Sequence, residues 1–433
     1  MPHTKPRLFI LTDISSCETG VREPDDAQSL VRLLYYANEF CIEGLCATSN
    51  MRHGPVCRPE IIHQIINAYA QDFANLARVD SGYMQPDALR AVVFAGESVA
   101  GPDIPVDQCV GAGKLSPAAQ HLISVVDRGD SRSLWIAVWG GTADLAQALY
   151  QVRASRSPAA LALFLSRLRV LAISDQDTTA EWIRQEFPTV WYWRKTLSFR
   201  GMYRGGNTAL CTYDWVNTHL THGRGALAQL YPNYKGGDIW WQTLGGVYGI
   251  KEGDTPSWLG LIPNGLHLPE HPELGGWGGR AIKVASFHFE DAVDTDVQDP
   301  SAPDPRMSTV FRWREDFQSD FLIRLNWAAG NATNAMTPFP MELHPRIEAY
   351  KQGIPVLLNA TDYLPESNLV DAHWQLYPKP ETADVECSET GPGKCSVCVM
   401  GNTANEPIAI VLKATYGAEL PLIRYVRVLL NPA

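Results

Sequence analysis

The sequence has no long hydrophobic run, no cluster of basic residues and few charged side chains. Its apolar runs stay well below the about 18 consecutive residues that a membrane helix needs, so no membrane-spanning segment is expected. Lysine and arginine number 36 against 47 aspartate and glutamate residues, which gives a formal net charge of −11. This charge would repel a polyphosphate backbone. We therefore expect neither a nucleic-acid polymer nor a membrane as a partner.

The sequence also lacks a signal-peptide core and the cysteine density of a disulfide scaffold. The stretch MPHTKPRLFILTD has about five consecutive apolar or small residues before an aspartate, too few for secretion, which predicts a cytoplasmic protein. Nine cysteines are spread over 433 residues, and we expect most of them to be reduced, buried thiols. The group CSETGPGKCSVC, residues 387–398, supplies three sulfurs without a nearby histidine. A hairpin with incidental thiols is therefore favoured there over a zinc site.

What the sequence does contain is the alternation of strands and helices that is typical of a parallel α/β sheet. Residues 200–310 are rich in glycine, tryptophan and proline, and they predict the loop-rich wall or lid of a pocket. Beyond them, short β-type runs predict a small all-β sandwich. We expect an α/β domain over residues 1–337, with a mostly parallel sheet and flanking helices, and the β-sandwich over residues 338–433. The predicted strands of the α/β domain are 7–12, 41–48, 133–139 and 168–174, and the predicted helices are 26–40, 58–76, 116–128, 142–154, 157–168 and 311–329.

Acidic residues follow the predicted strands at the edge of the sheet where ligands bind. Asp13 ends the first strand, Asp25 and Asp26 begin the next helix, and Asp175 and Asp177 follow the fourth strand. A role as helix cap would explain the presence of one such aspartate at the start of a helix. It does not explain three carboxylates at one rim, which repel one another unless positive charge lies among them. Arg22 would supply some of that charge, and a hard divalent cation such as Ca²⁺ would supply more.

Four stretches carry a family resemblance: EPDDAQSLVRLLYYANEFCIEGLCATS, ISDQDTTAEWIRQEFP, EGDTPSWLGLIPNGL and GGWGGR. They resemble the nucleoside hydrolase-like domain of proteins called cellulose-binding, which carry a C-terminal immunoglobulin-like β domain. The resemblance covers almost the whole chain. It implies the fold of the inosine-uridine nucleoside hydrolases, bound Ca²⁺ and hydrolysis of an N-glycosidic bond.

The resemblance also implies roles for individual residues. Asp13 corresponds to a Ca²⁺ ligand that is also the general base for water, and Asp25 and Asp26 correspond to a pair that binds a sugar hydroxyl and the metal. Asp254 corresponds to a late metal ligand, and the backbone carbonyl of Trp139 to a ligand from the middle strand. The expected catalytic residues are Asp13 and Asp25; the metal ligands are Asp13, Asp26, Trp139 and Asp254; and the substrate-binding residues are Asn50, Asp175, Asp177, Glu181, Asn264, Trp277 and Arg280.

The sequence departs from the family pattern in two places. Gly253 stands where such hydrolases often have a histidine that protonates the leaving base, so the leaving-group acid is unassigned. His53, Asp177 and Arg280 are candidates, although they also read as a surface loop residue, a helix cap and an ion-pair partner. The spacing from Asp13 to the aspartate pair is longer than in the family motif, with Glu18 and Glu23 added.

These features predict a Ca²⁺-dependent hydrolase that acts on a nucleoside or a related small ribosyl-like glycoside. The alternatives are a non-catalytic carbohydrate-binding or cellulose-binding protein, and a hydrolase or lyase of small-molecule metabolism. The β domain shows no catalytic constellation. We expect it to serve interdomain packing or homo-oligomer formation.

Overall fold

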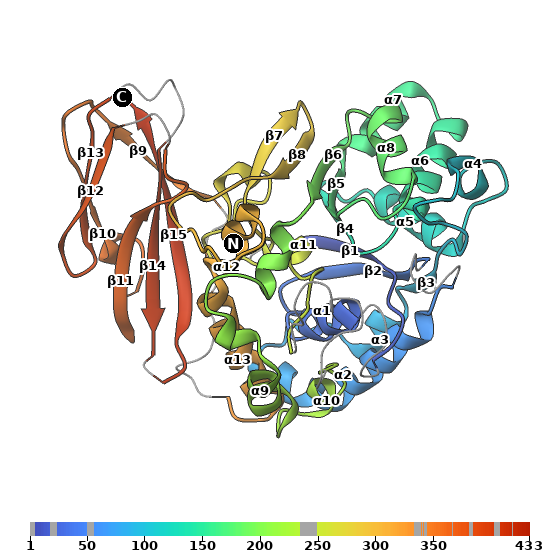
Figure 1. Cartoon of the computed structure of the whole chain (residues 1–433), viewed down its shortest axis with the longest axis horizontal. Coiled ribbons are helices and arrows are strands. Elements are labelled where there is room, and N and C mark those ends of the chain that lie inside the picture. Colours follow the sequence, from blue (N-terminus) through green and yellow to red (C-terminus); the bar gives the residue numbers. More distant parts are fainter. Residues whose placement is uncertain are drawn as a thin grey trace.

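A computed structural model describes residues 5–17, 24–49, 56–233, 249–332, 339, 341, 344–365, 367–380, 384–401, 408–417 and 419–433. Within these ranges the chain forms an α/β domain, up to residue 332, and a β domain, from residue 344 (Figure 1). The predicted boundary between residues 337 and 338 lies outside the described residues. No helix of the described ranges is both long enough and apolar enough to cross a membrane.

The α/β domain is built on one sheet of eight strands in the order β3-β2-β1-β4-β5-β6-β8-β7. Neighbouring strands are parallel from β3 to β8, and β7 pairs with β8 in the antiparallel direction. The mostly parallel sheet predicted from the sequence is therefore confirmed. The strands are β1 (Arg7–Thr12), β2 (Cys41–Ala47), β3 (Val93–Ala95), β4 (Leu134–Val138), β5 (Leu168–Ile173), β6 (Trp191–Lys195), β7 (Ala281–Ala285) and β8 (His288–Asp291).

Helices cover both faces of this sheet, as the unbroken apolar runs of its central strands require. Alternate residues of β1 point to opposite faces: Leu8 and Ile10 pack in a cluster with residues of α1 and α2, and Phe9 and Leu11 in a cluster with residues of α5 to α8. The helices are α1 (Pro24–Leu34), α2 (Pro59–Val79), α3 (Pro86–Arg90), α4 (Val106–Cys109), α5 (Pro117–Asp127), α6 (Ala143–Ser155), α7 (Pro158–Ser166), α8 (Thr179–Glu186), α9 (Tyr213–Val216), α10 (Ala226–Gln229), α11 (Pro256–Leu259), α12 (Ser308–Phe311) and α13 (Arg314–Ala328).

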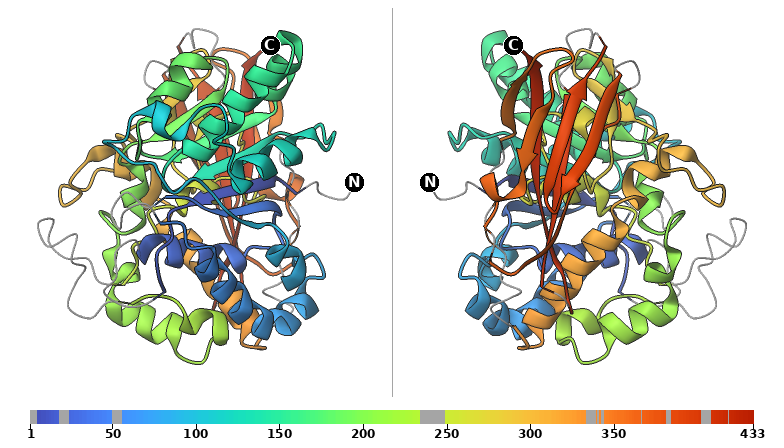
Figure 2. Two further views of the ribbon diagram at one scale, coloured as in Figure 1. Left: turned by 90° about the vertical axis from the view of Figure 1, so that its right-hand side faces the viewer. Right: turned by 90° about the vertical axis from the view of Figure 1, so that its left-hand side faces the viewer.

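The β domain is a sandwich of two small sheets, as predicted. One sheet has the order β10-β13-β12 and the other β11-β14-β15-β9, in which β9 runs parallel to β15. Figures 1 and 2 show the domain beside α13, against one side of the α/β domain. Its strands are β9 (Arg346–Tyr350), β10 (Val356–Asn359), β11 (Leu369–Leu376), β12 (Val385–Gly391), β13 (Lys394–Val399), β14 (Ile408–Tyr416) and β15 (Leu422–Pro432).

Buried polar contacts join the two domains. Asp316 of α13 accepts hydrogen bonds from Lys413 Nζ at 2.5 Å and from the Tyr425 hydroxyl at 2.5 Å. The indole N–H of Trp277 donates to the same Tyr425 hydroxyl at 3.1 Å. The backbone N–H of Tyr425 also donates to the Asn264 carbonyl at 2.9 Å. The segment around residues 264–277 is therefore tied to β15 by hydrogen bonds.

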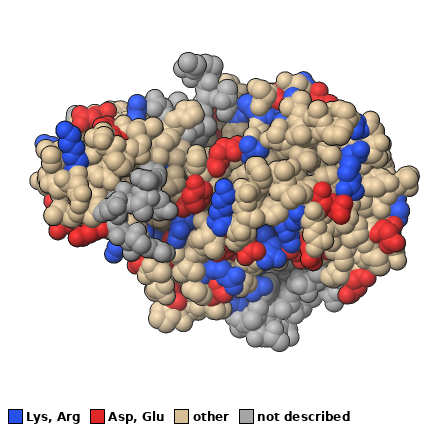
Figure 3. Space-filling view, turned by 90° about the horizontal axis from the view of Figure 1, so that it is seen from above, with Lys and Arg blue, Asp and Glu red and all other residues tan. Residues whose placement is uncertain are grey.

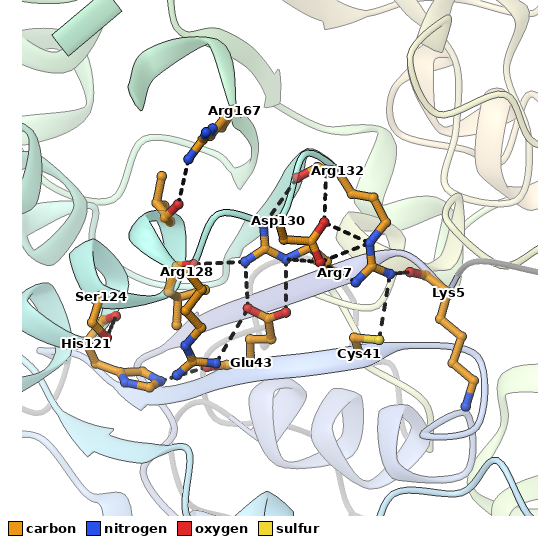
Figure 4. A network of polar contacts seen from close by, with 12 residues as sticks. Lys5, Arg7, Cys41, Glu43, His121, Ser124, Arg128, Asp130, Arg132 and Arg167 are labelled. Carbon is orange, nitrogen blue, oxygen red and sulfur yellow. Dashed lines mark hydrogen bonds and ion pairs between the residues drawn. The ribbon is translucent and has the colours of Figure 1, made fainter. Parts of the chain in front are cut away.

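The amino-terminal edge of the large sheet is closed by a network of ion pairs (Figure 4). Arg7, which is buried, donates to both carboxylate oxygens of Glu43 at 2.8 and 2.9 Å and to the Val125 carbonyl at 2.9 Å. Asp130 and Arg132 extend the network. Basic and acidic side chains pair with one another here, and on the face in Figure 3 the two signs are likewise interspersed.

Candidate active site

Three carboxylates converge at the opposite edge, beyond the carboxyl end of β1. Asp25 and Asp26 begin α1, and Asp254 precedes α11. Each offers one oxygen, and the three oxygens lie within 4.8 Å of one another. Asp26 and Asp254 are buried and Asp25 is half-buried. The structure thus brings together residues that are more than 220 positions apart in the sequence.

Asp13 lies directly beside this group. It follows β1, its side chain is 1% exposed, and it shares a side-chain hydrogen bond with Asp26. Thr12 also donates its hydroxyl proton to Asp26 Oδ1. Burial raises the pKa of the Asp26 carboxyl well above its usual range, and the charges of Asp13 and Asp25 raise it further. Unlike the opposite edge of the sheet, this cluster concentrates charge of one sign.

The donor set fits Ca²⁺, which binds several carboxylate and carbonyl oxygens in flexible geometry. The three converging oxygens are hard ligands, and a divalent cation would offset the repulsion that raises the pKa of Asp26. The expected metal ligands were Asp13, Asp26, Trp139 and Asp254. The structure adds Asp25 to the set of converging oxygens and places Asp13 at its border.

Two glycines after β4 allow the backbone to approach these carboxylates. A Cβ atom at Gly140 would lie 2.6 Å from Cβ and Cγ of Asp13, and one at Gly141 would lie 2.5 Å from Oδ2 of Asp177. Such distances are far below van der Waals contact, so a side chain at either position would displace a carboxylate. The glycines of the WGGT stretch therefore allow the backbone to pack directly against the Asp13 side chain.

Trp139 links the end of β4 to the loop that carries Asp254. Its indole N–H donates to Ser257 Oγ at 2.8 Å, and the Ser257 hydroxyl donates to the Asp254 carbonyl at 2.6 Å. The backbone carbonyl of Trp139, an expected metal ligand, accepts a hydrogen bond from the side-chain amide of Gln176. A carbonyl oxygen has two lone pairs, so this bond leaves one for a cation.

Helix α1 holds the loop that carries Asp254 from the other side. Gln28 Nε2 donates to the carbonyls of Pro232 and Gly249, and Gln28 Oε1 accepts from the N–H groups of Lys251 and Glu252, all at 2.6 to 3.1 Å. One turn further, Arg32 forms a fully buried ion pair with Glu252 at 2.5 Å. The i, i+3, i+7 spacing of Asp25, Gln28 and Arg32 places them on one face of the helix.

Gly253 occupies a crowded position next to Asp25. A Cβ atom there would lie 3.1 Å from Asp25 Oδ2 and 3.3 Å from the ring of Phe199. Two further buried side chains lie nearby: Lys251 Nζ is 5.2 Å from the centroid of the Tyr203 ring. Burial raises the pKa of the Tyr203 phenol, and the charges of Asp25 and Asp254 act in the same direction. No periodicity or motif in the sequence marked Tyr203 or Lys251.

The residues expected after β5 make structural contacts. Asp175 forms ion pairs with Arg184 at 2.7 Å and Arg194 at 3.0 Å. Asp177 accepts hydrogen bonds from the N–H groups of Thr179 and Ala143, as a capping residue does. Glu181 is exposed on α8 and accepts a hydrogen bond from Gln185.

The expected substrate contacts from the later part of the chain lie toward the β domain and β7. Asn264 accepts from the Leu266 N–H at 3.0 Å, and its own carbonyl accepts from Tyr425. Trp277 is fully buried against Tyr425. Arg280 forms an ion pair with Asp294 at 2.6 Å, which is the structural alternative considered for it. Asn50 lies outside the described residues, as do Glu18, Arg22, Glu23 and His53.

The fold and this acidic edge define a nucleoside hydrolase-like α/β protein with an appended β domain. The chain belongs to the family described as cellulose-binding Sde182, nucleoside hydrolase-like domain, which matches residues 7–281. Its fold is similar to the solved structure of a nucleoside hydrolase-related hypothetical protein from Saccharophagus degradans that is associated with carbohydrate metabolism. The two structures have a TM-score of 0.78 and 25% sequence identity, and the match covers 99% of this chain and 100% of the other. No curated protein matches the chain. The resemblance seen in the sequence is therefore confirmed.

Proposed function

We propose that the protein is a Ca²⁺-dependent hydrolase of the N-glycosidic bond in a nucleoside or a related small ribosyl-like glycoside. The observation that carries the proposal is the convergence of Asp25, Asp26 and Asp254 oxygens within 4.8 Å, beside buried Asp13. Cleavage of such a bond passes through an oxocarbenium-like state, which a cluster of negative charge stabilises. The nucleoside hydrolase-like family supports this reaction class.

The burial and position of each carboxylate suggest its role in metal binding, catalysis or sugar binding. Asp26 and Asp254, which are buried, would hold the ion with Asp13 and the Trp139 carbonyl. Bound Ca²⁺ would lower the pKa of a water molecule and fix sugar hydroxyls. Asp13 accepts the proton of the attacking water, and Gly140, which has no side chain, leaves room for its carboxylate. Asp25, the more exposed member, accepts a hydrogen bond from a sugar hydroxyl.

The leaving group needs a proton donor other than a histidine at position 253. We leave this donor unassigned, because burial and the charges of Asp25 and Asp254 raise the pKa of the nearby Tyr203 phenol and make it a weak acid. The missing side chain at Gly253 leaves the Asp25 carboxylate and the Phe199 ring facing that position. The Phe199 ring offers an apolar surface for a flat leaving base.

Calcium titration and turnover of a nucleoside panel test the proposal together. Chelator-treated wild-type protein should bind Ca²⁺ at millimolar or lower concentration by calorimetry and release free base from at least one nucleoside. Asp254→Asn should weaken Ca²⁺ binding, whereas Asp13→Ala should lower turnover by about a hundredfold or more. Asp87→Asn, whose side chain is 95% exposed, is the matched control. Absence of Ca²⁺ binding, or full activity of Asp13→Ala, would contradict the proposal.

A carbohydrate-binding role without turnover is the second candidate. It is favoured by the family description as cellulose-binding and by a cavity whose lining includes Trp135, Trp193 and His271. Retention on insoluble cellulose, with no product from any glycoside, would support it over the hydrolase. Turnover of a different small molecule would instead indicate a hydrolase or lyase recruited to other chemistry.

A further inference from the structure

Two cysteine thiols meet across the β12–β13 hairpin of the β domain. Cys387 lies on β12 and Cys395 on β13, and their Sγ atoms are 3.2 Å apart. In the antiparallel register, Cys387 is opposite Val397, and Glu389 is opposite Cys395. Because alternate residues of a strand share a face, the two thiols project from the same face as diagonal neighbours.

The third thiol of the hairpin points away from this pair. Cys398 is opposite Glu386, so it lies on the other face of the sheet from Cys395. Its Sγ is 3.5 Å from the sulfur of Met400. The three sulfurs therefore do not converge as a metal site requires, and the sequence group 387–398 resolves into one pair and one separate thiol.

The two members of the pair differ in accessibility. Cys395 is buried in the core of the sandwich, whereas Cys387 is half-buried at the edge strand β12. The hydrogen bond from the Cys395 thiol lowers the pKa of the Cys387 thiol, against the opposing effects of burial and of the Glu389 carboxylate. The same hydrogen bond, together with burial, raises the pKa of Cys395. Cys387 is thus the thiol that a reagent in solution meets first.

We propose that Cys387 and Cys395 form a reversible disulfide that joins the edge strand β12 to β13, with a small-molecule disulfide such as oxidised glutathione as the electron acceptor. The Cys387 thiolate attacks one sulfur of oxidised glutathione, forms a mixed disulfide and releases one glutathione thiolate. The Cys395 thiolate then attacks the Cys387 sulfur and releases the second. Two electrons and two protons leave the cysteine pair, and two molecules of glutathione form.

The geometry requires a small adjustment. A disulfide bond is about 2 Å long, so the sulfurs must approach by roughly 1 Å from their separation of 3.2 Å. The adjacent turn is already held in place, because the indole N–H of Trp374 on β11 donates to the Gly393 carbonyl at 2.8 Å.

Peptide mapping of the full chain after oxidation tests the inference. The reduced protein is incubated with oxidised glutathione, alkylated with N-ethylmaleimide and digested with trypsin. Trypsin cleaves after Lys394 and separates the two cysteines, so a disulfide appears as two linked peptides. We expect the linked peptides, a loss of two hydrogen masses from the intact protein before alkylation, and reversal by dithiothreitol.

Single substitutions identify the partners. The linked peptides should persist in Cys398→Ser, the matched control on the opposite face, and disappear in Cys395→Ser. Cys387→Ser, at a half-buried position, provides the same test if Cys395→Ser does not fold. A glutathione adduct on Cys387 without linked peptides would overturn the inference. Linked peptides that survive Cys395→Ser and vanish in Cys398→Ser would overturn it as well.

Discussion

His267 shows how a single buried side chain can be held in one protonation state. Its Nδ1–H donates to the Ile262 carbonyl at 2.7 Å, and its Nε2 accepts the backbone N–H of Trp277 at 2.9 Å. One nitrogen is therefore a donor and the other an acceptor, as only the neutral ring allows. Burial lowers the pKa of His267 from 6.5 to about 3.

This arrangement predicts an acid-sensitive contribution to stability. Because the folded pKa of His267 lies below the unfolded value, its contribution is complete above pH 6.5 and is lost as the pH falls from 6.5 toward about 3. The free energy of unfolding should fall by about 2 kcal/mol between pH 6.5 and 5 from this residue. Urea titrations should show this loss in wild type and in the control His271→Gln. An equal loss in His267→Gln would contradict the argument.

Individual residues of the candidate site could be predicted where the alternation of strands and helices in the sequence showed their place in the sheet. Asp13, Asp25 and Asp26 surround a strand-to-helix turn, and such turns of a parallel sheet lie at the ligand-binding edge. Asp254 depended on family resemblance, because no periodic element surrounds it. Tyr203 was missed, because its proximity to Asp25 and Asp254 arises from the tertiary fold and leaves no local signature.

Helix α1 determines the position of a loop more than 200 residues away in the sequence. Gln28 satisfies four backbone groups of Pro232, Gly249, Lys251 and Glu252, so both N–H groups and both oxygen lone pairs of its amide are used. The helix therefore holds the described end of this loop, at residues 249–252.

Replacement of Gln28 by leucine should loosen this loop. Four buried backbone groups would lose their partner, at a cost of about 1 to 3 kcal/mol for each that remains unsatisfied. We expect faster hydrogen exchange at Lys251 and Glu252 and weaker Ca²⁺ binding. Gln71→Leu on α2 is the control, because its exposed amide bonds a single carbonyl at 3.5 Å. Unchanged exchange in Gln28→Leu would refute the role of the helix.

At the level of elements, the buried strands were easier to predict than the exposed ones. β1, β2, β4 and β5 are mostly apolar runs, and the structure has strands in all four places, although the similarly buried β6 was not predicted. β7 escaped prediction because four of its five residues are exposed, so its sequence shows no buried face. The first helix was predicted to run to residue 40, but α1 ends at Leu34 and residues 35–39 form turns packed under the sheet.

The whole molecule is held together by the seam between its domains. Asp316, Tyr425 and Trp277 form one chain of buried hydrogen bonds across it. Arg427 of β15 also donates across it to the carbonyls of Leu266 at 3.0 Å and Gly275 at 3.1 Å. The change near residue 338 to short β-type runs in the sequence indicated a second, all-β fold. It did not reveal this seam, which joins residues more than 100 positions apart.

The seam predicts that the two domains unfold together. Calorimetry of the full chain should show one cooperative transition. Tyr425→Phe removes two buried hydrogen bonds and should lower the free energy of unfolding by about 1 to 3 kcal/mol, moving that transition as a unit. Tyr150→Phe, on α6 and away from the seam, is the control. Two resolved transitions, only one of which moves in Tyr425→Phe, would contradict this coupling.

The placement of β15 also has a consequence for protein synthesis. Domains generally fold in order as they leave the ribosome, but here the segment after Asp254 finds its partners at Tyr425 and Arg427. A nascent chain that has completed the large sheet still presents the carbonyls of Asn264 and Leu266 to solvent. The segment of residues 264–277 thus gains these hydrogen bonds only after β15 has been made, whereas the loop that carries Asp254 can already be held by Gln28 of α1.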